Sequence, residues 1–264
     1  MCAEATGITF PEYSFGEHMH YTEMLRDAFA FMRQGVFGNV GRWMRLVLAL
    51  IILTIPMNGY MMRIYRNAES APEVDQWGTL FIDGLKLMIV SFIYSIPIWL
   101  VWIATYGAWM MQVISGQADA AAISAWEPNL VLVVLMYIVE FAVALVLPVV
   151  AIRFARMGTF SEAFNFRAIF DHIARIGWIN YVIAIILITI VVAVPIMVLV
   201  FIFVLLGIGI AAVTNFSLTI IFGIIAVFLL LILAIAPLIM VFQGRYWTRV
   251  YDSATPAGNA ALTE

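Results

Sequence analysis

The stretch YVIAIILITIVVAVPIMVLVFIFVLL, from Tyr181 to Leu206, contains no charged residue. A helix that crosses the hydrocarbon core of a bilayer needs about 20 mainly apolar residues, so this stretch is long enough to span a membrane. Three other stretches are similar in length and nearly as apolar, and they cover residues 87–111, 130–152 and 217–242. The sequence therefore predicts an all-α, polytopic membrane protein with four transmembrane helices.

The composition agrees with a membrane protein along the whole chain. Of the 264 residues, 65% are hydrophobic and 11% are charged, whereas soluble domains average about 25% charged residues. The formal net charge is −3 and there is no long basic run, which excludes a free soluble enzyme, a nucleic-acid-binding protein and a disordered chain. We expect one helical membrane domain over residues 21–250, a polar tail over residues 1–20 and a flexible tail over residues 251–264.

A fifth apolar stretch, residues 46–62, is shorter and is interrupted by Pro56, Asn58 and Gly59. Lys and Arg precede and follow it, and they also lie between the second and third long spans and after the last one. Because cytoplasmic loops collect Lys and Arg, a re-entrant hairpin with its tip at residues 57–59 would place every basic residue and both termini in the cytoplasm. The alternative is a tilted fifth crossing with the N-terminus outside. We expect the re-entrant hairpin, in a multi-pass protein of the cell membrane.

Two stretches beside the spans, residues 21–36 and 160–176, carry apolar residues at helical spacing. Basic amphipathic helices next to spans commonly lie in the membrane interface, although the same pattern also fits helices packed beneath the spans. We expect His172 on the solvated face of the second helix. The side chains expected to contact lipid at the interface are Arg26, Arg33, Arg167, Arg175, Trp43 and Trp178.

Glu140 lies near the middle of the span 130–152, where an ionised carboxylate is costly and marks a candidate functional site. An ion or proton site would combine this carboxyl with Asn58 and Tyr60 of the hairpin and Tyr94 of the preceding span. The alternative is a neutral glutamic acid that only ties two helices together. No nucleotide-binding loop, metalloprotease motif or nucleophile motif is present, so we expect no cofactor, no metal site and no enzymatic activity.

Three passages resemble a largely archaeal family of membrane proteins known as domain of unknown function 4013. The first extends from Pro56-Met-Asn-Gly59 through Arg63 to Tyr94-Ser-Ile-Pro97. The second extends from Leu147-Pro148 to Trp178 and Tyr181, and the third is Gly244-Arg245-Tyr246. The resemblance implies a polytopic membrane protein, and it carries no activity over to this chain.

Two functions compete on this evidence. The first is a non-enzymatic scaffold that self-associates and organises the membrane or neighbouring membrane proteins, with lipids and copies of itself as partners and no nucleic acid. It is favoured by the scarcity of polar residues within the spans. The second is a channel or transporter for a small ion or lipid-like solute, using Glu140 and the broken hairpin around Asn58, since broken helices near the midplane are typical of such sites.

Overall fold

A computed structural model of the chain describes residues 20–116, 119–215 and 217–254. Within these ranges the chain forms helices and no strand, which confirms the predicted all-α architecture. Residues 1–19 and 255–264, which hold most of the two predicted tails, lie outside the described residues.

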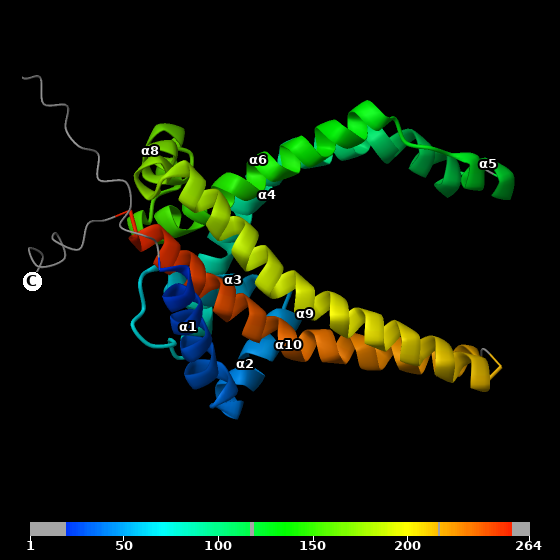
Figure 1. Cartoon of the computed structure of the whole chain (residues 1–264), viewed down its shortest axis with the longest axis horizontal. Coiled ribbons are helices and arrows are strands. Elements are labelled where there is room, and N and C mark those ends of the chain that lie inside the picture. The colour runs from blue at the N-terminus through cyan, green and yellow to red at the C-terminus, as the bar shows by residue number, and fades with distance from the viewer. Residues whose placement is uncertain (1–19, 117–118, 216, 255–264) are drawn as a thin grey trace, which may run out of the picture.

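Four long helices form two arms that diverge from a common base, where residues 21–37, 55–65 and 160–176 pack against the adjoining ends of these helices (Figure 1). One arm is the hairpin of α4 (Trp77–Ile114) and α6 (Leu130–Met157), with the short helix α5 (Ala120–Ala125) near its end. The other arm is the hairpin of α9 (Trp178–Val213) and α10 (Leu218–Asp252). All four are long and apolar enough to cross a membrane, as predicted. The 36 residues of α9 span about 54 Å, so this helix is longer than a hydrocarbon core of about 30 Å.

A short helical hairpin, α2 (Val40–Ile51) and α3 (Ile55–Tyr65), occupies the fifth apolar stretch. The chain reverses at Leu53 and Thr54, whose φ angles are 54° and 63°. Pro56 lies in the first turn of α3, where its missing N–H costs no hydrogen bond. The proline therefore begins a helix at this point instead of ending one.

The two ends of this hairpin meet at the base. Arg42, near the start of α2, forms an ion pair with Glu73 in the loop that follows α3. Its Nη1 atom also donates to the carbonyl oxygen of Gly35 at 2.6 Å, and Gly35 packs against Ala71. The chain thus leaves the base at the start of α2 and returns to the same place after α3.

The helices α3 and α4 pack backbone against backbone at two glycines. A Cβ atom on Gly59 would lie 1.9 Å from the carbonyl oxygen of Leu80, and one on Gly84 would lie 1.8 Å from that of Ile55. Only glycine permits such an approach. The predicted tip at residues 57–59 is wrong, because Asn58 and Gly59 are helical and the glycine serves helix packing instead of a turn.

The helix α1 (Tyr21–Met32) continues into the π-helical turn η1 (Arg33–Phe37), in agreement with the predicted helix 21–36. The carboxylate of Asp27 accepts hydrogen bonds from Arg245 Nε at 2.7 Å and Arg249 Nε at 2.8 Å. The hydrogen bond from Arg249 is the main reason that the pKa of Asp27 falls to about 2. This charged cluster fastens α1 to the C-terminal end of α10.

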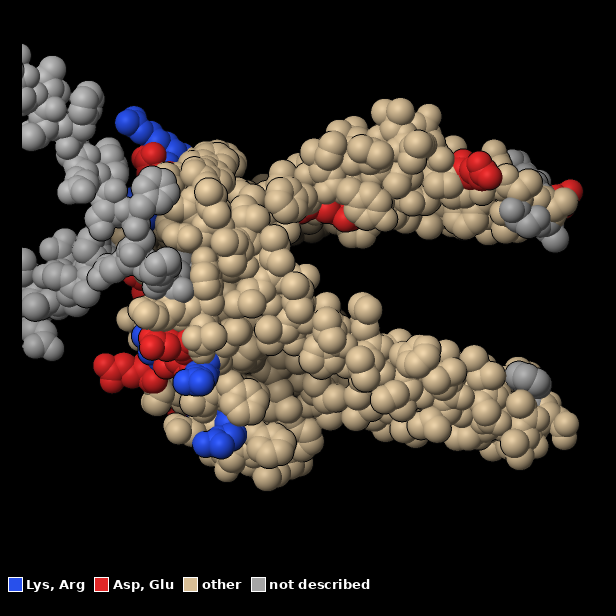
Figure 2. All heavy atoms as spheres, in the orientation of Figure 1, with Lys and Arg blue, Asp and Glu red and all other residues tan. Residues whose placement is uncertain are grey.

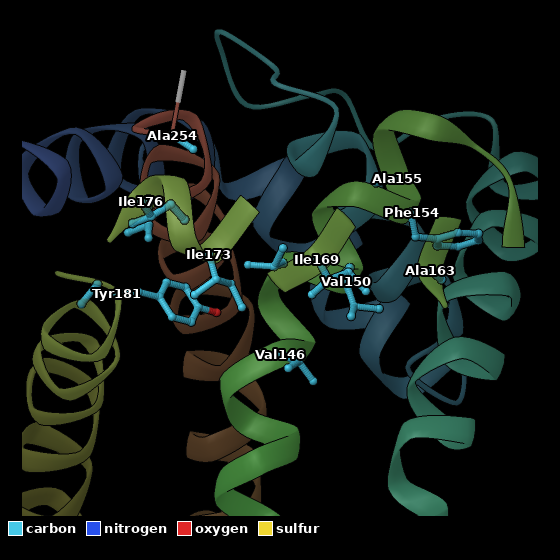
Figure 3. Packing of buried hydrophobic residues seen from close by; sticks show 14 of the residues in the cluster. Val146, Val150, Phe154, Ala155, Ala163, Ile169, Ile173, Ile176, Tyr181 and Ala254 are labelled. Carbon is cyan, nitrogen blue, oxygen red and sulfur yellow. The ribbon is translucent and has the colours of Figure 1, made fainter. Parts of the chain in front are cut away.

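The predicted helix 160–176 is divided into α7 (Phe160–Ala163) and α8 (Phe166–Ile176). The division occurs where the side chain of Asn165 accepts a hydrogen bond from the backbone N–H of Ala168 at 3.2 Å and so begins a new helix. The apolar face of α8 covers the base, and Figure 3 shows Ile169 and Ile173 pointing into the cluster of buried residues there.

His172 lies on the buried side of α8, with 5% of its surface exposed. Its Nε2 atom lies 3.0 Å from the carbonyl oxygen of Tyr251, and its Nδ1 atom lies 3.3 Å from Arg175 Nη2. A neutral ring that donates through Nε2 and accepts through Nδ1 satisfies both contacts. The prediction that His172 is solvated is wrong, because the C-terminal turns of α10 cover this side of α8.

Basic residues gather at one end of the molecule. All 13 Lys and Arg lie before residue 87, between 153 and 175, or at 245 and 249, and Figure 2 shows them at the base only, in that view. The far ends of the arms, residues 112–116, 119–129 and 207–215, contain none. The base therefore carries the Lys and Arg of the described chain, and the parts of the arms beyond it carry none.

Candidate functional site

A pocket of about 280 Å³ lies where the two arms join, between α3, α4, α6 and α10. Three neutral polar side chains reach it from three helices: Asn58 from α3, Ser91 from α4 and Gln243 from α10. The rest of its lining is apolar or aromatic and consists of Met61, Tyr65, Leu87, Ala144, Leu147, Pro148, Ala151, Met240 and Trp247.

The polar groups of this pocket are unpaired within the described part of the chain. The side chains of Asn58, Ser91 and Gln243 make no hydrogen bond there. Pro148 lies inside α6 and has no N–H, so the carbonyl oxygen of Ala144 loses its helical donor. Two amides, a hydroxyl and a backbone carbonyl therefore converge on one cavity, which thus offers both donors and acceptors.

Hydrogen bonds between helix ends hold the walls of the pocket together. Arg66 Nε donates to the carbonyl oxygen of Ala155 in α6 at 3.1 Å, and Arg156 Nε donates to that of Tyr65 in α3 at 3.0 Å. The last carbonyls of a helix have no intrahelical donor, so these arginines supply one. Arg66 also forms an ion pair with Asp83 at 2.8 Å, which fixes α4 to the same group.

Glu140 precedes Ala144 by four residues on α6, so it shares a helix face with the pocket lining and lies one turn farther along the arm. It is half-buried and forms no hydrogen bond or ion pair with the described part of the chain. Glu140 is not among the residues that line the pocket.

The structure does not bring the four predicted site residues together. Tyr60 is buried and its hydroxyl donates to the carbonyl oxygen of Pro72 at 3.2 Å. The hydroxyl of Tyr94 donates to the carbonyl oxygen of Ala163 at 2.7 Å. Asn58 reaches the pocket, but no contact joins it to Glu140 within the described residues. Both hydroxyls bond to backbone carbonyls of other segments instead of reaching the pocket, and the spacing of the tyrosines in the sequence does not reveal these partners.

The predicted interfacial arginines are exposed. Arg26 of α1 and Arg33 of η1 form no ion pair within the described residues, and Arg167 lies 4.0 Å from Asp171. Arg175 instead donates to His172. Contact of these side chains with lipid stays a prediction.

The two predicted interfacial tryptophans differ in their surroundings. Trp43 Nε1 donates to the carbonyl oxygen of Ala234 at 2.9 Å and so joins α2 to α10. Trp178 is 45% exposed and stacks on Phe170 with a centroid separation of 6.1 Å. Trp178 remains available at the surface, whereas Trp43 helps to hold the hairpin.

Ser91 and Gln243 were not among the residues predicted from the sequence. Hydroxyls in apolar helices usually bond to their own backbone, as Ser95 does to the carbonyl oxygen of Phe92 at 2.7 Å. Ser91 makes no such bond, and only the structure distinguishes the two serines. A usable signal was Pro148, since a proline inside a span always frees one carbonyl.

Residues 44–204 match a protein family whose description is "Protein of unknown function (DUF4013)". The matched range covers most of α2 to α9, including three of the four walls of the pocket. No curated protein and no solved structure matches the chain.

Proposed function

The chain belongs to the DUF4013 family, whose function is unknown, and on that premise we propose that it is a non-enzymatic, multi-pass membrane protein that carries a small uncharged polar solute through the pocket between α3, α4, α6 and α10. The single observation that supports this proposal is the convergence of unpaired polar groups on that pocket. It retains the transporter hypothesis and replaces the midplane ion site with a neutral one.

Unpaired polar groups in an apolar protein favour a ligand. Asn58, Ser91 and Gln243 are half-buried, and their side chains are unpaired within the described residues. A ligand that buries these groups without hydrogen bonds would lose about 1–3 kcal/mol for each group. A solute with hydroxyl or amide groups would pair with these side chains and with the carbonyl oxygen of Ala144. The pocket therefore gains most from a guest that both donates and accepts hydrogen bonds.

The lining also limits the size and charge of the solute. Among the described residues that line the pocket none is charged, and a bare ion is costly to hold without an opposite charge. The volume of about 280 Å³ equals that of roughly nine water molecules at about 30 Å³ each. We therefore infer a compact, neutral, hydrogen-bonding solute.

We infer that the base faces the cytoplasm and that α2 and α3 form a re-entrant hairpin. The Lys and Arg of the base support this orientation through the tendency of cytoplasmic loops to be basic. The ion pair of Arg42 and Glu73 supports the hairpin, because residues on opposite sides of a bilayer cannot touch. Both termini would then be cytoplasmic.

Reconstituted vesicles test the transport function directly. Stopped-flow light scattering should show that vesicles with the protein take up glycerol or urea faster than protein-free vesicles. The double variant Asn58→Leu/Gln243→Leu should return the rate to the protein-free value, since it removes both unpaired amides. The matched control Thr189→Val should keep the rate, because Thr189 is exposed and bonds to its own helix. No acceleration by the wild type with either solute would refute the proposal.

A second candidate is the self-associating scaffold, and Glu140 is the observation that favours it. A carboxyl within a span that lacks a partner in the described part of its own chain gains stability from a partner on another copy. Single-molecule photobleaching at decreasing protein-to-lipid ratios should then reveal dimers or larger oligomers that Glu140→Leu disperses. A wild type that is monomeric at every ratio would exclude this role. Proton flux compared between wild type and Glu140→Gln tests the remaining ion-conducting version.

A further inference from the structure

An apolar groove of about 340 Å³ lies along the second arm, between α9 and α10. Its α9 side extends from Val191 to Leu199, which is about 12 Å at 1.5 Å per residue. Phe29 and Met32 of α1 line it as well. Figure 1 shows α1 (dark blue) crossing the base at a steep angle to the arms. The groove therefore has α1 at its basal end and follows the arm away from it.

Two unpaired cations stand beside this end of the groove. Arg26 precedes Phe29 by three residues and Arg33 follows it by four, so all three share one face of the helix. Both arginines are exposed and without an ion pair in the described part of the chain. Asp27, the acidic residue between them, is occupied by Arg245 and Arg249. The positive charge of this face is therefore free to bind an anion.

We propose that this site binds one anionic phospholipid, whose phosphate pairs with Arg26 and Arg33 while one acyl chain lies in the groove. Guanidinium groups match phosphate oxygens with paired hydrogen bonds, and the apolar lining suits a hydrocarbon chain. The charge at one end and the apolar groove that follows it reproduce the two parts of such a lipid. This site is separate from the polar pocket and does not depend on the transport proposal.

Competition for lipid in native mass spectrometry tests the site. The detergent-purified protein, given equal amounts of phosphatidylglycerol and phosphatidylcholine, should retain the anionic lipid preferentially. Arg26→Gln/Arg33→Gln should lower this preference about fivefold for each arginine, as expected for about 1 kcal/mol per basic residue at an anionic surface. The matched control Arg167→Gln removes an arginine that is 94% exposed on α8 and should leave the preference unchanged. Ile196→Trp, which fills the groove, should release the anionic lipid while melting at the wild-type temperature.

Four results would overturn the proposal. The first is an unchanged preference in the double arginine variant, and the second is an equal loss in Arg167→Gln. The third distinguishes a lipid from a free anion: inorganic phosphate at millimolar concentration should not displace the bound lipid, and complete displacement would reduce the site to simple anion binding. The fourth is retention of the lipid by Ile196→Trp, which would show that the lipid binds to the arginines without using the groove.

Discussion

The contact between α3 and α4 allows a sharp prediction about stability. Gly59→Ala would place a Cβ atom 1.9 Å from the carbonyl oxygen of Leu80, and Gly84→Ala would place one 1.8 Å from that of Ile55, whereas Cβ atoms essentially never come within 3.0 Å of such an atom. The two helices must therefore separate by about 1 Å, because neither neighbour is a flexible side chain. Overpacking of this kind costs about 1–3 kcal/mol, against a gain of about 1 kcal/mol from replacing a helical glycine.

Because the clash is with backbone on both helices, we expect an overpacking cost of about 3 kcal/mol. After the gain from replacing glycine, the free energy of unfolding should fall by about 2 kcal/mol. For a chain of this size it corresponds to a fall of about 4–8 °C in melting temperature. Tryptophan fluorescence during heating in detergent measures it. The matched control is Gly223→Ala on α10, where nothing lies within 4 Å of the new Cβ, and it should keep or raise the melting temperature.

The double variant Gly59→Ala/Gly84→Ala tests the mechanism itself. Both glycines serve one helix crossing, so the separation forced by the first Cβ atom makes room for the second. The combined loss should therefore be clearly smaller than the sum of the single losses. Additive losses, or a Gly59→Ala variant as stable as Gly223→Ala, would refute the argument that one close approach fixes the hairpin to α4.

Four further predictions follow from the base and the pocket. Asp27→Asn leaves the buried Arg245 without its counter-ion. It should lower the free energy of unfolding by about 3 kcal/mol, measured as a lower melting temperature. Burial lowers the pKa of His172 to about 4, so stability should fall as the pH drops from about 6.5 to about 4, and His172→Gln should remove this part of the pH dependence. Pro148→Ala restores a donor for the freed carbonyl and should lower solute uptake without lowering stability. Cysteines introduced as Phe37→Cys and Ser70→Cys in a cysteine-free background should react with an impermeant maleimide from one side of the membrane, and labelling from opposite sides would exclude the re-entrant hairpin.

The positions of the transmembrane and amphipathic helices could be predicted from the sequence, because they depend on the length of the apolar stretches and on the distribution of charge. The four spans and the amphipathic helices α1 and α8 are properties of single segments. The reversal at Leu53 and Thr54 was missed, because the expected breakers, Pro56 and Gly59, have other roles there. A proline suits the first turn of a helix as well as it suits a break, and a glycine in a helix can mark a close contact with another helix.

The polar pocket depends on relations that a linear sequence does not contain. Asn58, Ser91 and Gln243 come from three helices, and nothing in the sequence states that they share a cavity. The expected partner, Glu140, is one helical turn away from that cavity. Periodicity predicts which face of a helix a residue occupies, but the neighbour of that face is set by the crossing of helices. At this site that crossing depends on the glycine contact between α3 and α4.

The tip of the hairpin has the properties that a lipid environment demands. With 12 and 11 residues, α2 and α3 are about 18 and 16 Å long, roughly half of a hydrocarbon core. Non-helical backbone in lipid must satisfy its own hydrogen bonds. The N–H groups of Ile52, Leu53 and Thr54 all donate to carbonyl oxygens of residues 48–51, while the side chain of Leu53 is 77% exposed. A turn with an apolar surface and paired backbone N–H groups is suited to hydrocarbon and is costly to expose to water. This supports a hairpin that dips into the bilayer. Its second helix, α3, forms one wall of the pocket.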